Sequence, residues 1–239
     1  MAGTYGDTNP HMPIASDAWP SLPPLLSRRA ALRRPAIELC AVRSSAGGIR
    51  VLAHLDALRA MLPSTVALTG FADSGFYLDV DSFTHLKRFV VSDDGHNATR
   101  LLSSTCVAAF PGEKEKCLIA QRAAPFLQTP TYVWQSRYDL DQRSCEITPA
   151  CAASTACVDA YAGNLSSAVH EQLLSRRWPH HGAFIDACGR HCDDGLAQPL
   201  QNPTVDAHTP LQAFALWHAT RHLMHARAVW EAPGGQQAC

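Results

Sequence analysis

The stretch from Ile37 to Leu62 constrains the fold of this chain more than any other. Residues 37–42 are apolar except for Glu38, which is typical of a short, mostly buried strand. The run breaks at a Ser/Gly-rich turn, SSAGG at 44–48. Leucines and Ile49 then recur at helical spacing until Pro63 ends the pattern. The order of strand, tight turn and helix predicts an α/β unit.

A sharp turn of small residues between a strand and a helix is the setting in which a serine can act as a nucleophile. Such a turn lifts one hydroxyl clear of the sheet. On this interpretation Ser45 is the nucleophile, and the backbone N–H of Ala46 is an oxyanion donor supported by the helix dipole. The usual pattern is Gly-x-Ser-x-Gly, and Arg43 occupies the position of the first glycine. An ordinary Ser/Gly turn, common in α/β proteins, is the alternative.

Length and charge narrow the classes of protein that this chain can be. Its 239 residues are enough for one α/β domain with a sizeable core. With 20 basic and 21 acidic residues, the net charge of −1 predicts neither a nucleic-acid surface nor an anionic-membrane surface. No stretch approaches the ~18 consecutive apolar residues of a membrane span. We expect a monomer without a metal or cofactor.

Cysteine is frequent, which favours an oxidising compartment. Apart from Cys40, the nine cysteines lie mostly in predicted loops, with one at the end of the chain: Cys106, Cys117, Cys145, Cys151, Cys157, Cys188, Cys192 and Cys239. Zinc is disfavoured because no CxxC pair occurs, and Cys40 is expected to be a buried thiol. Asn97 and Asn164 begin glycosylation acceptor sequences. The first residues nevertheless lack the basic segment and apolar run of a signal peptide.

The remaining pattern continues the alternation of strands and helices. Further strands are predicted at 65–69, 130–135 and 181–187. Helices are predicted at 157–173 and from the N-cap Thr209 to about Trp230. Residues 1–36 are expected to be an irregular lead-in with a short helix at 25–32, 80–128 a cap or insertion of little periodicity, and 231–239 a tail. The predicted domain therefore spans 37–230.

Three polar residues, Asp73-Ser74-Gly75, follow the second predicted strand. Open α/β sheets bind ligands just beyond the carboxyl ends of their strands, so these residues are candidates for substrate binding. A simple turn is the alternative.

Two more polar residues follow later strands and complete a candidate catalytic set. Asp139 follows the third strand and His191 the fourth, which gives the chain order Ser45, Asp139, His191 that is typical of α/β-hydrolases. A serine hydroxyl is a weak nucleophile unless a histidine takes its proton, and a carboxylate orients that histidine. Taken singly, Asp139 is equally a turn or cap residue, and His191 a histidine beside a disulfide.

Several of these blocks, in the same order, resemble the pectin acetylesterase/Notum family. They are SSAGG at 44–48, FADSGFYLD at 71–79, Tyr138-Asp139, ACGRHC at 187–192 and Trp217-x-x-x-Arg221. The resemblance implies a secreted, disulfide-rich serine carboxylesterase with an α/β-hydrolase-like fold, in which a mostly parallel sheet is flanked by helices. It places the family's nucleophile on Ser45, its acid on Asp139 and its base on His191.

The chain departs from the family pattern before the turn. Family members carry earlier strands and a Gly-Gly-Trp-type loop that supplies a second oxyanion donor, whereas the 44 residues before Ser45 hold no such motif. We therefore expect an N-terminally truncated member that lacks the usual N-terminal strands, which also explains the missing signal peptide. Arg43 is expected to crowd the turn.

The residues and the resemblance together predict a carboxylic ester hydrolase. The implied substrates are acetyl esters on cell-wall polysaccharide such as pectin, or a longer acyl group on a protein, as in Notum-type enzymes. The alternative is a truncated, catalytically weak or inactive member that acts as a non-catalytic glycan-binding module. An extracellular or cell-wall location is expected from the family and from the cysteines.

Overall fold

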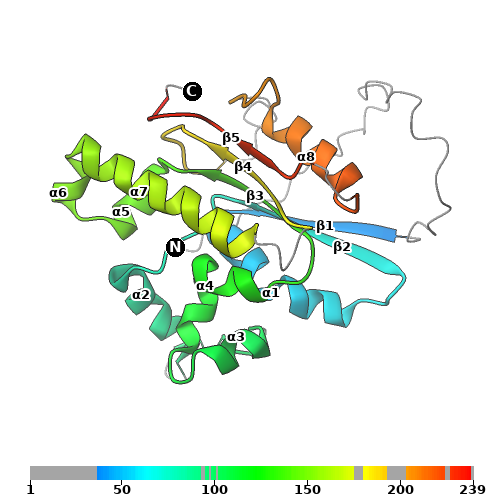
Figure 1. Ribbon diagram of the computed structural model, residues 1–239. Coiled ribbons are helices and arrows are strands. Elements are labelled where there is room, and N and C mark those ends of the chain that lie inside the picture. Colours follow the sequence, from blue (N-terminus) through cyan, green and yellow to red (C-terminus); the bar gives the residue numbers. More distant parts are fainter. Residues whose placement is uncertain are drawn as a thin grey trace, which may run out of the picture. The chain divides into compact units, whose positions relative to one another are not determined.

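The computed structural model describes residues 37–92, 95–96, 98–100, 102–174, 180–192, 203–223 and 227–237. The lead-in at 1–36, its helix at 25–32, Asn97 and Cys239 lie outside the described residues. Within them, one parallel sheet has the strand order β1-β2-β3-β4-β5 (Figure 1). The strands are β1 (Ile37–Ser44), β2 (Val66–Asp73), β3 (Thr131–Ser136), β4 (Gly182–Asp186) and β5 (Val229–Glu231). The predicted α/β class with a parallel sheet is confirmed.

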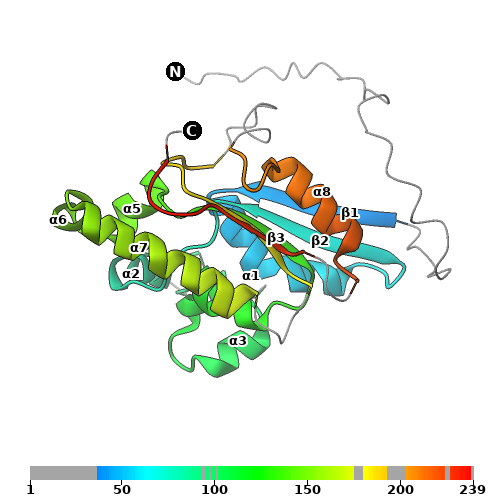
Figure 2. The ribbon, with the colours of Figure 1, turned by 45° about the horizontal axis from the view of Figure 1, so that its top comes forward.

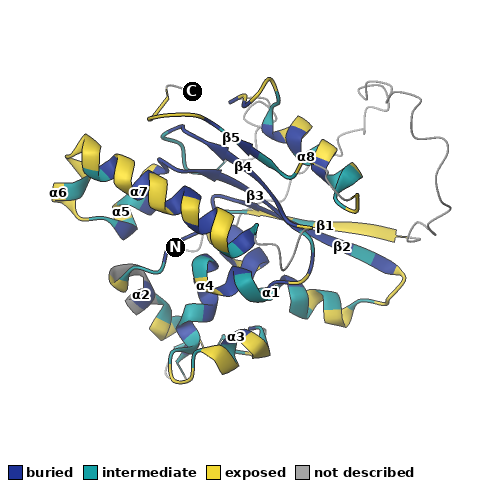
Figure 3. Ribbon diagram, in the orientation of Figure 1, coloured by how far each residue is buried: buried dark blue, intermediate teal, exposed yellow. Residues whose placement is uncertain are grey.

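Helices cover both faces of this sheet, with α8 on one face and α1 and α7 on the other (Figures 1 and 2). The helices are α1 (Ala46–Met61), α2 (Asp81–Val91), α3 (Ser104–Ala109), α4 (Ala120–Ala123), α5 (Leu140–Glu146), α6 (Pro149–Ala152), α7 (Thr155–Ala168) and α8 (Pro210–Thr220). Shorter turns are the 3₁₀ segments η2 (Lys114–Leu118) and η3 (Ala124–Phe126) and the π segment η4 (Val169–Leu173). Since both faces are covered, β3 is buried along its whole length (Figure 3).

Two hydrophobic clusters lie on the two faces. The first joins α1 and α7 to the sheet and includes Leu52, Leu55, Leu68, Val133, Leu165 and Ile185. The second is mostly aromatic, lies under α8 and includes Phe71, Tyr132, Trp134, Trp217 and Trp230. Together they anchor the central strands whose carboxyl ends carry the candidate site.

The first strand differs from the expectation of burial. Ile37 is 55% exposed and Val42 is 50% exposed, and Cys40 is exposed as well. Most of the β1 arrow accordingly has the colour of exposed residues in Figure 3. β1 stands at one end of the strand order, and of its residues only Ala41 packs against one of the described hydrophobic clusters, so most of its side chains remain accessible. The predictions of a mostly buried strand and of a buried Cys40 thiol were wrong.

The end of the chain also differs from the expected long helix. The helix α8 begins with the predicted N-cap Thr209, whose side chain forms a capping box with Gln212. It ends at Thr220, and Val229–Glu231 forms β5 beside β4. Trp230 is fully buried in the aromatic cluster, which explains why this short segment is a strand. A three-residue strand is too short to leave a periodic signal.

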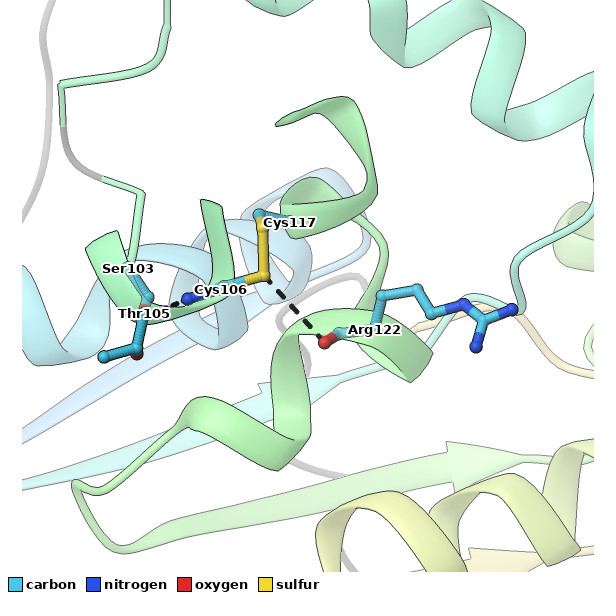
Figure 4. The surroundings of a disulfide bond; sticks show 5 residues. All are labelled: Ser103, Thr105, Cys106, Cys117 and Arg122. Carbon is cyan, nitrogen blue, oxygen red and sulfur yellow. Dashed lines mark hydrogen bonds between the residues drawn. A yellow bond between two sulfur atoms is a disulfide. The ribbon is translucent and has the colours of Figure 1, made fainter. Parts of the chain in front are cut away.

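The segment predicted as a cap or insertion, 80–128, contains the helices α2, α3 and α4. Ala120 and Ala124 belong to the main core cluster. The disulfide Cys106–Cys117 ties α3 to η2, and Figure 4 shows the Cys106 sulfur beside the backbone carbonyl of Arg122 on α4. The segment is therefore packed against the core. The domain boundaries themselves stay a prediction.

A buried carboxyl group links three segments on the α7 side of the sheet. Glu146 accepts hydrogen bonds from the backbone N–H of Leu78 at 2.7 Å and from the hydroxyl of Tyr161 at 2.6 Å. Burial, opposed by these two hydrogen bonds, raises the pKa of Glu146 to about 8. The folded protein therefore holds a proton on this group at pH values where the unfolded chain has lost it.

This raised pKa predicts a measurable pH dependence of stability. The free energy of unfolding should fall as the pH rises from about 5 through about 8, because the folded state binds the Glu146 proton more tightly than the unfolded state. Glu146→Gln, which is neutral at every pH, should remove that part of the decline. Urea unfolding across this pH range measures it, with Glu113→Gln on the surface as the control. Parallel curves for Glu146→Gln and the parent chain would show that Glu146 does not titrate in this way.

Candidate active site

The turn after β1 has an unusual backbone conformation at Ser45. Its φ is 53° and its ψ is −126°, a combination that a residue with a side chain rarely adopts. The strained conformation is held from both sides: the Ser45 N–H donates to the carbonyl of Asp73 at 2.9 Å, and the Ser45 carbonyl accepts from the N–H of Ile49 at 3.1 Å. A sharp strand-to-helix turn of this kind is the conformation of a nucleophile elbow.

Two glycines allow the helix after the turn to approach the end of β2. A Cβ atom on Gly75 would lie 2.5 Å from the carbonyl carbon of Gly48, and one on Gly48 would lie 2.9 Å from the carbonyl oxygen of Asp73. Side chains at these positions would push the start of α1 away from β2. The SSAGG and DSG sequences are therefore explained by close backbone packing around Ser45.

The bulky cation two residues before Ser45 is accommodated. Arg43 is exposed, and its guanidinium donates to the carbonyl of Val42 at 2.9 Å. A Cβ atom on Gly47 would lie 2.9 Å from the Cβ of Arg43, so glycine at 47 leaves room for the arginine. The expected crowding of the turn is relieved by this glycine.

The structure brings the three residues named from chain order into one hydrogen-bonded line. The Nε2 atom of His191 lies 2.7 Å from the Oγ of Ser45. The Nδ1 atom of His191 lies 2.8 Å from Oδ2 and 2.9 Å from Oδ1 of Asp139. Asp139 is fully buried, and it is also the N-cap of α5, where it accepts from the N–H of Gln142 at 3.0 Å. The cap and the histidine partner, which sequence reasoning set as alternatives, are both present.

The surroundings of the imidazole determine which nitrogen carries its proton. A carboxylate only accepts hydrogen bonds, so Nδ1 of His191 is the donor to Asp139, and Nε2 is free to accept from the Ser45 hydroxyl. Burial alone would lower the pKa of His191. The hydrogen bond and charge of Asp139, with the charges of Asp141 and Asp73, outweigh burial and raise that pKa above its ordinary value. This arrangement favours proton transfer from the serine to the histidine.

Sequence reasoning missed a second carboxylate beside the histidine. The Oδ2 atom of Asp141 lies 3.6 Å from Nε2 of His191, and it accepts a hydrogen bond from the hydroxyl of Tyr77 at 3.1 Å. The signal was present as the spacing Asp139-Leu140-Asp141, since the residue two positions after an N-cap lies in the first helical turn beside it. Asp141 adds negative charge on the serine side of the imidazole.

The residues predicted for substrate binding and for the oxyanion site lie next to this line. Asp73 and Ser74 are buried, and the Ser74 hydroxyl donates to Asp73 at 3.1 Å and accepts from the N–H of Cys192 at 2.8 Å. Ala46 is exposed and is the first residue of α1, so its N–H has no acceptor within the helix. Their roles toward a substrate stay predictions.

The described residues offer neither a metal cluster nor a membrane-spanning helix. No group of three or more His, Cys, Asp or Glu side chains in this part of the chain is arranged to hold a metal ion. None of the helices described is both long and apolar enough to cross a membrane. Nε2 of His218 on α8 lies 3.0 Å from Oε1 of Glu38 on β1.

Comparison with known proteins now identifies the family. The sequence profile described as Pectinacetylesterase matches residues 39–233. The chain belongs to the pectinacetylesterase family. A solved structure of the Wnt deacylase Notum from Drosophila has the same fold as this chain, with a TM-score of 0.66 and 25% identity, and the match covers 85% of this chain and 58% of that one. The resemblance stated from the sequence blocks is confirmed.

Relatives of this family member fall into two groups by name. The palmitoleoyl-protein carboxylesterase NOTUM of Drosophila melanogaster is 31% identical over 131 residues, which are 49% of this chain and 19% of that protein. Pectin acetylesterase 5 of Arabidopsis thaliana is 25% identical over 204 residues, 74% of this chain and 46% of that protein. Pectin acetylesterase 7 of Arabidopsis thaliana is 23% identical over 172 residues, which are 64% of this chain and 44% of that protein. The chain thus spans less than two thirds of each of these relatives.

The position of Asp141 predicts a shift in the titration of the histidine. Asp141→Asn removes a negative charge beside Nε2, so the pKa of His191 should fall. Titration of the His191 imidazole by NMR measures this without requiring any reaction. Asp81→Asn at the exposed start of α2 is the control and should leave that pKa unchanged. Equal His191 pKa values in parent and Asp141→Asn would contradict the electrostatic role of Asp141.

Proposed function

We propose that this chain is a serine carboxylesterase that acts through Ser45, His191 and Asp139. The observation that carries the proposal is the hydrogen-bonded line from the Ser45 hydroxyl through His191 to the buried Asp139 carboxylate, starting at a strained strand-to-helix turn. Membership of the pectinacetylesterase family supports it. Each residue type has the role that ester hydrolysis needs at that place.

In the proposed reaction, Nε2 of His191 takes the hydroxyl proton as the Oγ of Ser45 attacks the ester carbonyl carbon. Asp139, bonded to Nδ1, stabilises the imidazolium that forms. The N–H of Ala46 donates to the developing oxyanion. Nε2 then gives its proton to the departing alcohol oxygen, leaving an acyl group on Ser45. A water molecule, deprotonated by His191, releases the acid and restores the serine.

The proposed substrate is an acetyl ester on a polysaccharide such as pectin. The family description and the named pectin acetylesterases of Arabidopsis thaliana support this choice. Removal of a longer acyl group from a protein is the second candidate, because the NOTUM relative has the higher identity, 31%, over the part that it matches. The acyl chain length separates the two.

We place this activity outside the cell or in the cell wall. Two disulfides, Cys106–Cys117 and Cys151–Cys157, fit an oxidising compartment. Asn164, which begins one glycosylation acceptor sequence, is exposed on α7. These features support secretion and glycosylation as proposals.

The function is tested by ester hydrolysis with a matched pair of serine variants. Ser45→Ala should lower kcat/KM for p-nitrophenyl acetate by about 1,000-fold or more, because no other group replaces the nucleophile. Ser104→Ala, an exposed serine on α3, should leave it unchanged. Equal rates for Ser45→Ala and the parent chain would exclude catalysis by Ser45. A parent chain without hydrolysis would favour the non-catalytic, glycan-binding alternative.

Substrate class is tested with two further assays on the same proteins. Acetate release from acetylated pectin, lost in Ser45→Ala, is expected for a pectin acetylesterase. A strong preference for p-nitrophenyl octanoate over the acetate ester, with no acetate released from pectin, would instead favour the longer acyl substrate.

A further inference from the structure

A partly buried cation, Arg190, directly precedes the histidine of the proposed site in the chain. The guanidinium carbon of Arg190 is 3.5 Å from the centre of the Trp134 ring, a close cation–π contact. Its Nη2 lies 3.1 Å from Oδ1 of Asp73, and its Nε lies 3.5 Å from Oδ2 of Asp186. The Trp134 indole also donates to Oδ2 of Asp186 at 2.8 Å. The guanidinium of Arg190 is therefore held by the Trp134 ring on one face and by the carboxylates of Asp73 and Asp186.

Cys192, which follows His191, is held by residues 73–74 at the end of β2. The N–H of Cys192 donates to the hydroxyl of Ser74 at 2.8 Å, and that hydroxyl donates to Asp73 at 3.1 Å. The neighbours of the histidine, at 190 and 192, are therefore both attached to residues 73–74. Both of those residues are buried, so their own positions are set by the core.

This segment also holds the serine. The carbonyl of Asp73 accepts from the N–H of Ser45 at 2.9 Å, and the N–H of Ser74 donates to the carbonyl of Trp134 at 2.8 Å. The end of β2 therefore fixes the backbone of the candidate nucleophile and the loop of the candidate base at once. The line from Ser45 to His191 depends on both attachments.

We propose that Arg190 is a positioning residue, which holds His191 in line with Ser45 through its ion pair with Asp73. The inference rests on the proposed function, since it assigns Arg190 to that same site. It also gives Asp73 and Ser74 a role in supporting the site, beside the substrate role predicted from their place after β2. A displacement of about 1 Å at a catalytic group typically lowers the rate about 100-fold. Loss of the ion pair between Arg190 and Asp73 should therefore lower kcat measurably.

The test compares Arg190→Met with a matched ion-pair variant, Arg122→Met. Methionine keeps an unbranched apolar side chain in place of the arginine stem and removes the guanidinium. Arg122 also pairs with a carboxylate, Asp79 at 2.6 Å, in a part of the chain that does not contact His191. In p-nitrophenyl acetate hydrolysis by the full chain, Arg190→Met should lower kcat on the order of 100-fold with KM little changed. Arg122→Met should leave kcat unchanged.

Two further variants keep the test decisive if Arg190→Met does not fold. Arg190→Lys retains a cation for Asp73 but loses the flat guanidinium over Trp134, and it should recover part of the lost kcat. Asp73→Asn retains the shape and loses the charge, and it should lower kcat as Arg190→Met does. If folded Asp73→Asn and folded Arg190→Lys both have the same kcat as the parent chain, the proposal is overturned.

A readout that needs no activity separates this inference from the proposed function. The proton on Nδ1 of His191, bonded to Asp139, should give its own far-downfield NMR signal. The signal should persist in Arg122→Met and be lost or broadened in Arg190→Met and Asp73→Asn. If the signal is present in the parent chain and responds to the variants in this way, but the parent chain hydrolyses no ester, the positioning role stands and the proposed function fails. If it hydrolyses the ester and neither signal nor kcat responds to these variants, the positioning role fails.

Discussion

The hydrogen bond from the Ser45 N–H to the Asp73 carbonyl is the contact on which the rest of the site depends. It continues the pairing of β1 with β2 one residue beyond Ser44, at the point where β1 must turn into α1. The turn could relax to an ordinary conformation without it, and the serine hydroxyl would lose its place. The glycines at 48 and 75 allow the two segments to come this close.

The parallel sheet explains why residues so far apart in sequence meet here. In a parallel sheet all carboxyl ends lie at one edge, and the register places Ser44 beside Asp73, Asp73 beside Trp134, and Ser136 beside Asp186. The turn after β1 supplies the candidate nucleophile Ser45. The loop after β3 supplies Asp139 and the loop after β4 supplies His191. The hydrophobic clusters on both faces of the sheet fix the strands, and the fixed strand ends hold these loops close together.

Much of this arrangement could be predicted from residue patterns, for identifiable reasons. The strands at 65–69, 130–135 and 181–187 were found because they are apolar runs bounded by turn residues, and Thr209 was found because a cap has a local signal. The exposure of β1 could not be predicted, because a buried strand and an edge strand with apolar residues read alike. The strand at Val229–Glu231 was missed because burial of Trp230, a tertiary effect, decides it.

The residues of the candidate site likewise fall into those that the sequence predicted and those that it did not. Ser45, Asp139 and His191 were named from chain order and local context, and the structure places them within hydrogen-bonding distance, while their catalytic roles stay a prediction. Asp141 was missed although its spacing from Asp139 gave a local signal, and Arg190 was missed because its contacts with Asp73 and Trp134 depend on side-chain geometry. Asp73 was noticed, but its ion pair with Arg190 joins residues 117 positions apart, which no local pattern encodes.

We propose that the surroundings of Ser45 make its hydroxyl an activated nucleophile, and covalent labelling tests this most directly. A fluorophosphonate ester reacts with an activated serine and leaves a stable adduct that peptide mass spectrometry can locate. The expected result is one adduct on Ser45, formed by the folded chain and lost when His191 is replaced by alanine. An adduct confined to other serines, or a folded chain that leaves Ser45 unmodified, would contradict the claim.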